Sequence, residues 1–586
     1  MSFIVPYQFF RYANSKLSAK SSIGPLYSSD GSLTTDSLAK ASILQDTFVQ
    51  SFTLDNGRLP RTSDFKRPPG NLSHIVFSSS LVRRAIKKLK TKTAAGPDGI
   101  PPSFFINCIE ELCYPLSLLF TFCFDNGILP AAWLVSYITP IFKKGNPALA
   151  NNYRPIALTA IMCKLMETIM KDQIVCFLLD KGIISKSQHA FMRNHSTTTN
   201  LLASLHDLSV GLNSHLYTDI VYIDFSKAFD SIVSSKLLLK LEFYGITGAL
   251  LNWIKAFLSS RIQSVVMDRF FSPVAAVSSG VPQGSVLGPV LFILYINDIG
   301  SVCSGDTTMQ LFADDAKLYC NVTLNNGVSL QHSLDKLANW AAEWQLTINI
   351  GKCSVLAISA ANRPRSSLYF INGIAIPQRS EQVDLGVTIT SCLSFDVHIN
   401  KIVSKARLRT STLFRGFVTR NLYIIRQAFI PNIRPILEYN SVVCNPSLTH
   451  LINAIESVQR HFSKRIPQLS ALTYFERLAL LDLEPLEARR LRFDLIYYFK
   501  ILHNLTPFNP DDVFIIHTPI ASSRSTIPHL QKPTNASNKL LHDFFYRHVD
   551  IWNALPAEIR TLTSLPTFKC KLLKCDFLPY LKGNYT

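Results

Sequence analysis

The sequence contains no apolar run long enough to cross a membrane. Its longest uninterrupted apolar stretches, such as residues 290–296, fall well short of the roughly 20 residues that a transmembrane helix needs. Internal repeats and low-complexity tracts are absent as well, so a repeat architecture is not expected. We therefore predict a folded chain that has no membrane partner.

A paired cysteine pattern is also lacking. The twelve cysteines are scattered, and a chain of 586 residues is too long to be a disulfide scaffold, so we expect a reducing compartment, the nucleus or the cytoplasm or both. Cys570 and Cys575 are spaced as C-x4-C, but no second pair or histidine couple completes a zinc site. We interpret them as ordinary cysteines.

Acidic residues are in short supply. Lys and Arg number 59 against 40 Asp and Glu, which gives a net charge of +19 and an isoelectric point near 9.4. A field of that sign favours a polyanionic partner such as nucleic acid. An ordinary basic soluble protein remains the alternative, because charge alone does not separate the two.

Hydrophobic residues, by contrast, are plentiful. They make up 47% of the chain and include 38 Phe and 20 Tyr, enough for a large packed core and several subdomains. Residues 1–75 carry Ser, Gly, Pro and Asn with only short apolar runs, which predicts a linker or arm. Residues 78–89 predict a helix whose cationic face either follows a phosphate backbone or is simply solvated. Residues 236–258 predict one long amphipathic helix.

Two predicted strands carry carboxylates where they end. Residues 216–225 form an apolar run that leads straight into Asp224, and residues 311–319 predict a hairpin with Asp314 and Asp315 at its tip. Neighbouring carboxylates about 4 Å apart repel by roughly 1–4 kcal/mol, so a buried cluster requires a cation. Hard oxygen ligands suit Mg²⁺. An Asp-Asp pair by itself, however, is more often a solvated turn.

Six motifs in a fixed order decide between these readings. They are Ala94-Ala95-Gly96-Pro97-Asp98-Gly99, Asn152-Tyr153-Arg154-Pro155-Ile156, Tyr222-Ile223-Asp224-Phe225-Ser226-Lys227-Ala228-Phe229-Asp230, Gly280-Val281-Pro282-Gln283-Gly284-Ser285, Phe312-Ala313-Asp314-Asp315 and the strand Asp384-Leu385-Gly386-Val387. With these motifs in this order, residues 76–395 resemble the reverse transcriptases of non-LTR (LINE-type) retrotransposons, particularly the Jockey and CR1-like elements.

The resemblance implies an α+β fold, a right-hand polymerase with an antiparallel palm sheet and a helical C-terminal region. Residues 396–466 hold 11 Lys or Arg against 3 acids and are the candidate for the thumb, which would hold a duplex through its shape and phosphates. The expected divisions are a linker or arm (1–75), fingers (76–215), palm (216–393), thumb (394–470) and a helical region (471–586).

The resemblance also assigns the metal site. Asp224, Asp314 and Asp315 match the family's acidic triad, and the backbone carbonyl of Phe225 is a further expected ligand. Two Mg²⁺ ions, or Mn²⁺ in their place, would activate a 3′-hydroxyl and stabilise the leaving pyrophosphate. Lys352 is similar to a family lysine that protonates the pyrophosphate.

Four further residues match positions that bind the incoming dNTP. Lys143, with Lys144 as an alternative, and Arg154 would hold the triphosphate. Gln283 would contact the dNTP and the template base. Phe229, five residues after Asp224, matches an aromatic floor under the sugar that would clash with a 2′-hydroxyl. RNA-dependent RNA polymerases tend to have Asp at that spacing.

Two further segments are similar to elements of the family that contact the primer and the template. Gly386 is similar to the turn of the primer grip. Residues 188–193 match a template-contact element only loosely, because His189 and Ala190 depart from the usual pattern. That departure leaves the role of this element open and does not affect the triad.

The implied activity is RNA-directed DNA synthesis by target-primed reverse transcription, in which the 3′-hydroxyl of nicked genomic DNA is extended on the element's RNA. Its partners would be an RNA template, a DNA primer or target, and dNTPs. No upstream endonuclease is evident, so we expect a truncated element that depends on an endonuclease from another chain. The main alternative is a catalytically dead, nucleic-acid-binding remnant. An intron-encoded maturase or a telomerase fits the motifs less well.

Overall fold

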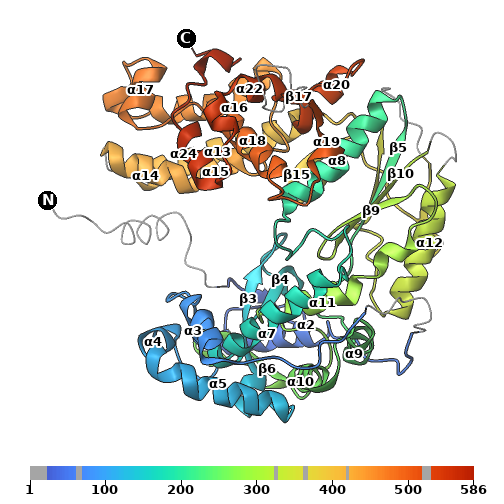
Figure 1. The fold of residues 1–586 in the computed structure, drawn as a ribbon. Helices are drawn as coiled ribbons and strands as arrows, with labels where there is room; N and C mark the ends of the chain where they lie inside the picture. The colour runs from blue at the N-terminus through green and yellow to red at the C-terminus, as the bar shows by residue number, and fades with distance from the viewer. Residues whose placement is uncertain are drawn as a thin grey trace.

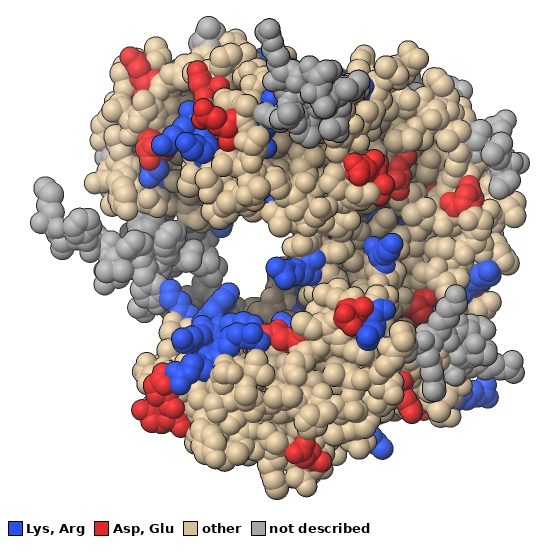
Figure 2. Space-filling view, in the orientation of Figure 1, with Lys and Arg blue, Asp and Glu red and all other residues tan. Residues whose placement is uncertain are grey.

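The computed structural model describes residues 23–60, 69–322, 327–359, 367–417, 421–517 and 529–585. The fold mixes helices and mostly antiparallel sheets, in agreement with the α+β class that the sequence predicts. Figure 1 shows a lower body built from earlier segments and an upper helical body built from later ones. A sheet with helix α8 (Thr197–Asn213) connects the two on one side. Figure 2 shows an opening between the bodies.

The connecting sheet has four antiparallel strands in the order β11-β5-β10-β9. Its central strand β5 (Thr218–Ile223) is buried because both of its faces are covered. Val221 and Ile223 belong to the core of the lower body, whereas Ile220 joins the core of the upper body. The other strands are β9 (Thr308–Phe312), β10 (Asp315–Asn321) and β11 (Ser354–Ile358).

A second sheet lies in the lower body and corrects the prediction for the N-terminal segment. Its strands β3 (Val135–Phe142), β4 (Tyr153–Leu158) and β6 (Ile262–Met267) are covered by helix α2 (Ser37–Val49). Residues 1–75 are therefore not a linker throughout. The helix went unrecognised because its buried stripe includes polar and small side chains, namely Lys40, Ala41, Leu44, Gln45 and Phe48.

The predicted long helix over residues 236–258 is also wrong, because the chain folds into two helices there. Helix α9 (Ser234–Phe243) and helix α10 (Gly248–Leu258) are separated by Gly245. Gly245 has a φ of +82°, and a Cβ at this position would lie 2.8 Å from the backbone oxygen of Gly70. A continuous helix cannot include that left-handed residue.

The described part of the upper body is mostly helical, and it also contains strand β15 (Val387–Thr390) and a small hairpin of β16 (Ile515–His517) and β17 (His529–Gln531). Four helices share one apolar core: α13 (Asp396–Gly416), α14 (Leu422–Asn432), α15 (Arg434–Glu438) and α16 (Thr449–Lys464). A second core joins α8 to α18 (Leu486–Leu502) and α24 (Leu565–Leu572).

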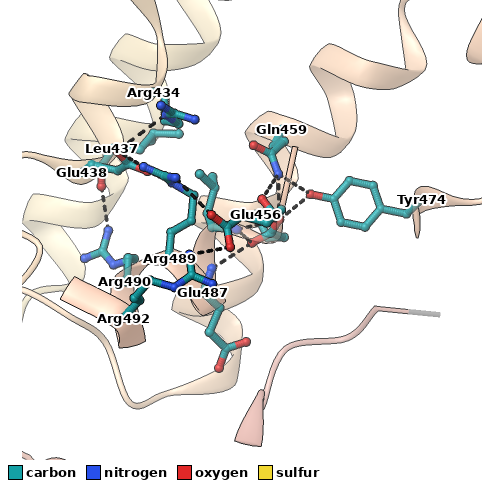
Figure 3. Close-up of polar contacts among 12 residues, drawn as sticks. Arg434, Leu437, Glu438, Glu456, Gln459, Tyr474, Glu487, Arg489, Arg490 and Arg492 are labelled. Carbon is teal, nitrogen blue, oxygen red and sulfur yellow. Dashed lines mark hydrogen bonds and ion pairs between the residues drawn. The ribbon is translucent and has the colours of Figure 1, made fainter. Parts of the chain in front are cut away.

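Buried polar contacts fix α18 to α15 and α16, as Figure 3 shows. The carboxylate of Glu456 accepts hydrogen bonds from the Tyr474 hydroxyl and from the Leu486 backbone nitrogen at the start of α18. Arg489 pairs with Glu438, and Arg490 donates to the backbone oxygen of Leu437 at 2.7 Å. Because these groups are largely buried, α18 is held rigidly against the neighbouring helices.

Among the described residues, the helices that are long are too polar, and the apolar ones too short, to span a bilayer. Further helices earlier in the chain are α3 (Ser79–Lys87), α4 (Pro102–Asn107), α5 (Ile109–Asp125), α6 (Ala131–Leu134), α7 (Ile161–Asp180) and α11 (Gly288–Ile296), and α12 (Val328–Glu343) lies beside the connecting sheet (Figure 1).

Candidate active site

The three carboxylates singled out in the sequence converge at one edge of the connecting sheet. Asp224 directly follows β5, and Asp315 begins β10. Since Ala316 pairs with Ile223, the antiparallel register places Asp315 opposite Asp224. Asp314 occupies the tight turn before β10, where Ala313 adopts a φ of +55°.

Burial and mutual repulsion dominate the electrostatics of Asp314 and Asp315. Burial raises the pKa of Asp315 to about 6, and the charges of Asp314, Asp384 and Asp224 add to the rise. The pKa of Asp314 is raised by burial and by Asp224, although Arg154 and Lys143 oppose this. Bringing further positive charge to this edge would relieve the repulsion.

The donor atoms fit a hard divalent cation. Asp224 Oδ2 is buried and accepts no hydrogen bond, and its nearest cationic group is the Lys352 ammonium at 3.5 Å. Phe225 is held beside it by a bridge to Ile348. Among the described residues, no three acidic, His or Cys side chains already form a closed metal site.

Cationic side chains face the carboxylates from the second sheet. Arg154 lies on β4 opposite Ile141 of β3. The backbone nitrogen of Lys143 donates a hydrogen bond to the backbone oxygen of Asn152 at 2.8 Å. Burial lowers the pKa of Lys143, and so do the charges of Arg154, Lys352 and Lys227. Of the two adjacent lysines, Lys143 is the one whose charge acts on Asp314.

Phe229 has a fixed ring. It is half-buried and stacks on Phe292 of α11, with ring centroids 4.1 Å apart and planes at 12°. Its carbonyl accepts a hydrogen bond from the Val281 nitrogen at 3.0 Å. Gly280 lies against the same segment, where a Cβ would be 2.8 Å from Asp230 Cα. Close packing between the two motifs therefore positions the aromatic side chain.

Gln283 reaches a carboxylate that sequence reasoning had not assigned. Its side-chain amide donates to Asp230 Oδ1 at 2.7 Å. The following Gly284 has a φ of +135°, and a Cβ there would lie 2.2 Å from the Ala157 oxygen. The turn is thus fixed by its contact with β4. The Asp230 carboxylate is buried, which raises its pKa.

The motif at residues 384–387 is a hairpin turn rather than one strand, which corrects the prediction. Strands β14 (Glu381–Asp384) and β15 (Val387–Thr390) are joined by Leu385 and Gly386, with φ values of +43° and +85°. Two successive positive φ values make a tight two-residue turn, whose second position suits glycine. The Tyr439 hydroxyl donates to the Leu385 oxygen at 2.9 Å.

A groove joins this turn to the carboxylates. Its floor contains a buried ion pair between Lys317 of β10 and Asp384 of β14, with 2.6 Å between Nζ and Oδ2. The groove is lined by Asn200, Tyr222, Ile223, Asp224, Gln310, Phe312, Asp315, Ala316, Lys317, Lys352, Gln382, Val383, Asp384, Leu385 and Gly386.

The loosely matching segment at residues 188–193 supports the carboxylate turn through internal bonds. Gln188 Oε1 accepts from the Ala313 nitrogen at 3.0 Å, just before Asp314. His189 is buried between Thr199 and Gln310, and burial lowers its pKa to about 4. Its departure from the family pattern therefore leaves a neutral histidine with a structural role.

Parts of this chain are similar to known proteins. Residues 141–389 match the family described as reverse transcriptase (RNA-dependent DNA polymerase). The RNA-directed DNA polymerase from mobile element jockey of Drosophila funebris is 28% identical over 351 residues, covering 58% of this chain and 38% of that protein. Its Drosophila melanogaster counterpart is 27% identical over 401 residues, covering 66% and 43%.

A further relative is the probable RNA-directed DNA polymerase from transposon X-element of Drosophila melanogaster. It is 25% identical over 405 residues, covering 67% of this chain and 44% of the relative. The chain thus spans less than half the length of these relatives.

Proposed function

Because residues 141–389 form a reverse transcriptase domain related to those of Jockey-like non-LTR elements, we propose that the chain is an RNA-directed DNA polymerase. It would extend a DNA 3′-hydroxyl on an RNA template, in target-primed reverse transcription. The observation that carries the proposal is the register that sets Asp224 opposite Asp315, with Lys143 and Arg154 facing them.

The carboxylates and the Phe225 carbonyl would hold the metal. When bound, two Mg²⁺ ions, or Mn²⁺ in their place, supply the Lewis acidity that activates the 3′-hydroxyl and stabilises the leaving pyrophosphate. Asp224 offers an oxygen that has no hydrogen bond to lose. Lys352, whose Nζ lies 3.5 Å from that oxygen, is placed to give a proton to the pyrophosphate.

The dNTP would lie between the carboxylates and the second sheet. Arg154 and Lys143 would bind the triphosphate, and Gln283, braced by Asp230, would contact the nucleotide and its template base. The Phe229 ring would exclude a 2′-hydroxyl, since its stacking on Phe292 leaves it little freedom to move away.

The two bodies would act as the parts of a right hand around a duplex. In this layout residues 76–215 are fingers, 216–393 palm and 394–470 thumb, and Gly386 belongs to the primer grip. The opening in Figure 2 supports this layout, since basic side chains gather on its lower rim, where helix α3 lies in Figure 1. We also propose that an endonuclease from another chain nicks the target, and that the enzyme works in the nucleus, the cytoplasm or both.

Primer extension on poly(A) with oligo(dT) tests the proposal. We expect Mg²⁺-dependent synthesis from dTTP that Asp314→Ala reduces by about 10³-fold or more, because the substitution removes a metal ligand. RNA binding, followed by fluorescence anisotropy, should be retained in the variant. A wild-type protein that binds RNA and never extends the primer would instead identify a dead binding remnant.

A further inference from the structure

A second pocket lies beyond the primer-grip turn, where the helical C-terminal region meets α8 and α15. It is enclosed by side chains of α18 and α24 together with the segment after α15. The residues that line it are Thr198, Glu438, Asn440, Ser441, Val442, Arg489, Arg492, Phe493, Ile496, Tyr497, Lys500, Lys569 and Leu573. Four of these are cationic and one is acidic, so the lining carries an excess of three positive charges.

Two of the cations have no acid to neutralise them. In the described part of the chain, neither Lys500 nor Lys569 has a carboxylate within 4.0 Å. Lys500 extends over the Tyr497 ring, with its Nζ 5.6 Å from the ring centroid, and is half-buried. The positive charge of Lys569 and burial both lower the pKa of Lys500. An anion between the two ammonium groups would relieve their repulsion.

Two buried donors in the same lining also lack acceptors. Arg492 is 8% exposed, and its Nε makes no hydrogen bond although its Nη1 pairs with Glu484. Asn440 is 9% exposed, and its Nδ2 is unpartnered while its Oδ1 accepts from the Thr198 hydroxyl. Buried donors without acceptors are uncommon in folded proteins. An excess of positive charge beside spare N–H donors is a setting that suits phosphate oxygens.

The pocket and the catalytic groove are lined by neighbouring positions of the chain. Asn200 of α8 lines the groove, and Thr198, two residues earlier on the same helix, lines the pocket. Between them, Tyr439 bonds to the Leu385 oxygen of the primer-grip turn, while its neighbours Glu438 and Asn440 face the pocket. A strand that ends at the carboxylates and passes this turn would therefore meet the pocket next.

We propose that this pocket binds backbone phosphates of the primer–template duplex as it leaves the catalytic groove. The C-terminal region would thus be part of the nucleic-acid interface. The contacts of Glu456, Arg489 and Arg490 hold α18 rigidly (Figure 3), so Lys500 is presented on a fixed helix. This inference rests on the proposed polymerase function, because that function defines the direction of the duplex.

The test compares Lys500→Gln/Lys569→Gln with Lys571→Gln. Lys571 is an exposed lysine on α24 that does not line the pocket, so Lys571→Gln controls for the loss of one positive charge elsewhere on the same helix. Affinity for an RNA–DNA duplex is measured without dNTPs, by fluorescence anisotropy, over a range of salt concentrations. Duplexes are lengthened upstream one base pair at a time, and thermal unfolding verifies that each variant is folded.

We expect the double variant to bind long duplexes about tenfold or more weakly than wild type near 0.1 M salt, with a log–log salt slope smaller by about 2. Below a threshold length, at which the duplex no longer reaches the pocket, the double variant and wild type should bind equally. Lys571→Gln should behave as wild type throughout.

An equal loss at every length, no loss at all, or the same loss in Lys571→Gln would overturn the inference. Because binding is measured without synthesis, the result is separable from the proposed activity. A threshold and a loss in a protein that never extends primers would refute only the polymerase proposal. Normal primer extension by the wild type, with no difference in duplex affinity between the wild type and the variants, would refute only the proposal that the pocket binds the duplex.

Discussion

The ion pair under the groove offers the strongest test of how the turn at Leu385 and Gly386, the proposed primer grip, is held in place. Lys317 and Asp384 are 5% and 9% exposed at the side chain, and each lies on a different sheet. Asp384→Leu would leave a buried ammonium group without its partner, which costs about 3–5 kcal/mol. Asp315 is close enough to Asp384 for its pKa to be affected, so it can take over part of the pairing. We therefore expect Asp384→Leu to cost about 3 kcal/mol, the low end of that range.

The double variant Lys317→Met/Asp384→Leu should recover most of that loss, because replacing a buried pair by apolar side chains is often close to neutral. Hydrogen exchange of the β14–β15 amides measures the local opening free energy, with the β5 amides as an internal reference. Asp384→Leu should speed exchange by about 100-fold relative to the double variant. Primer extension should show a raised KM for the primer–template and an unchanged KM for dTTP.

Equal exchange rates in Asp384→Leu and in the double variant would refute this reasoning, since no coupling would then exist between the two charges. A coupling energy below about 0.5 kcal/mol would mean that the pair is effectively solvated. An altered KM for dTTP with a normal KM for the primer would show that the pair acts on the nucleotide side and not on the turn.

Two further predictions concern the aromatic floor and the upper body. Phe229→Val should narrow the preference for dTTP over UTP by at least about tenfold in kcat/KM, while leaving duplex affinity unchanged; an unaltered ratio in single-nucleotide extension would remove Phe229 from sugar selection. Burial raises the pKa of Glu456 to about 7, above its ordinary value of 4.5. The folded state thus binds this proton more tightly, and stability should fall by up to about 3 kcal/mol as pH rises from about 4.5 to 7. Glu456→Gln should flatten this slope in denaturant titrations between pH 5 and pH 8, and an unchanged slope would assign it to other groups.

The sequence by itself predicted a reverse transcriptase domain and the place of its carboxylates. Six motifs in order led to that prediction, in agreement with the family match of residues 141–389, and the apolar run before Asp224 predicted a buried strand that β5 confirms. The hairpin that carries Asp314 and Asp315 could also be predicted from the sequence, because the alternation of side chains along a strand and the turn that follows are local properties. Both can be inferred from neighbouring residues alone.

Tertiary structure decided what depends on contacts between distant segments. Helix α2 packs on the second sheet although its stripe is partly polar, and Gly245 ends α9 because of a contact with Gly70. The Gln283–Asp230 bond, the Lys317–Asp384 pair and the basic pocket beside α8 each join residues separated by 50 positions or more. The periodicity of hydrophobic residues carries no information about such pairs, because strand register and the packing between elements depend on contacts that form only in the folded chain.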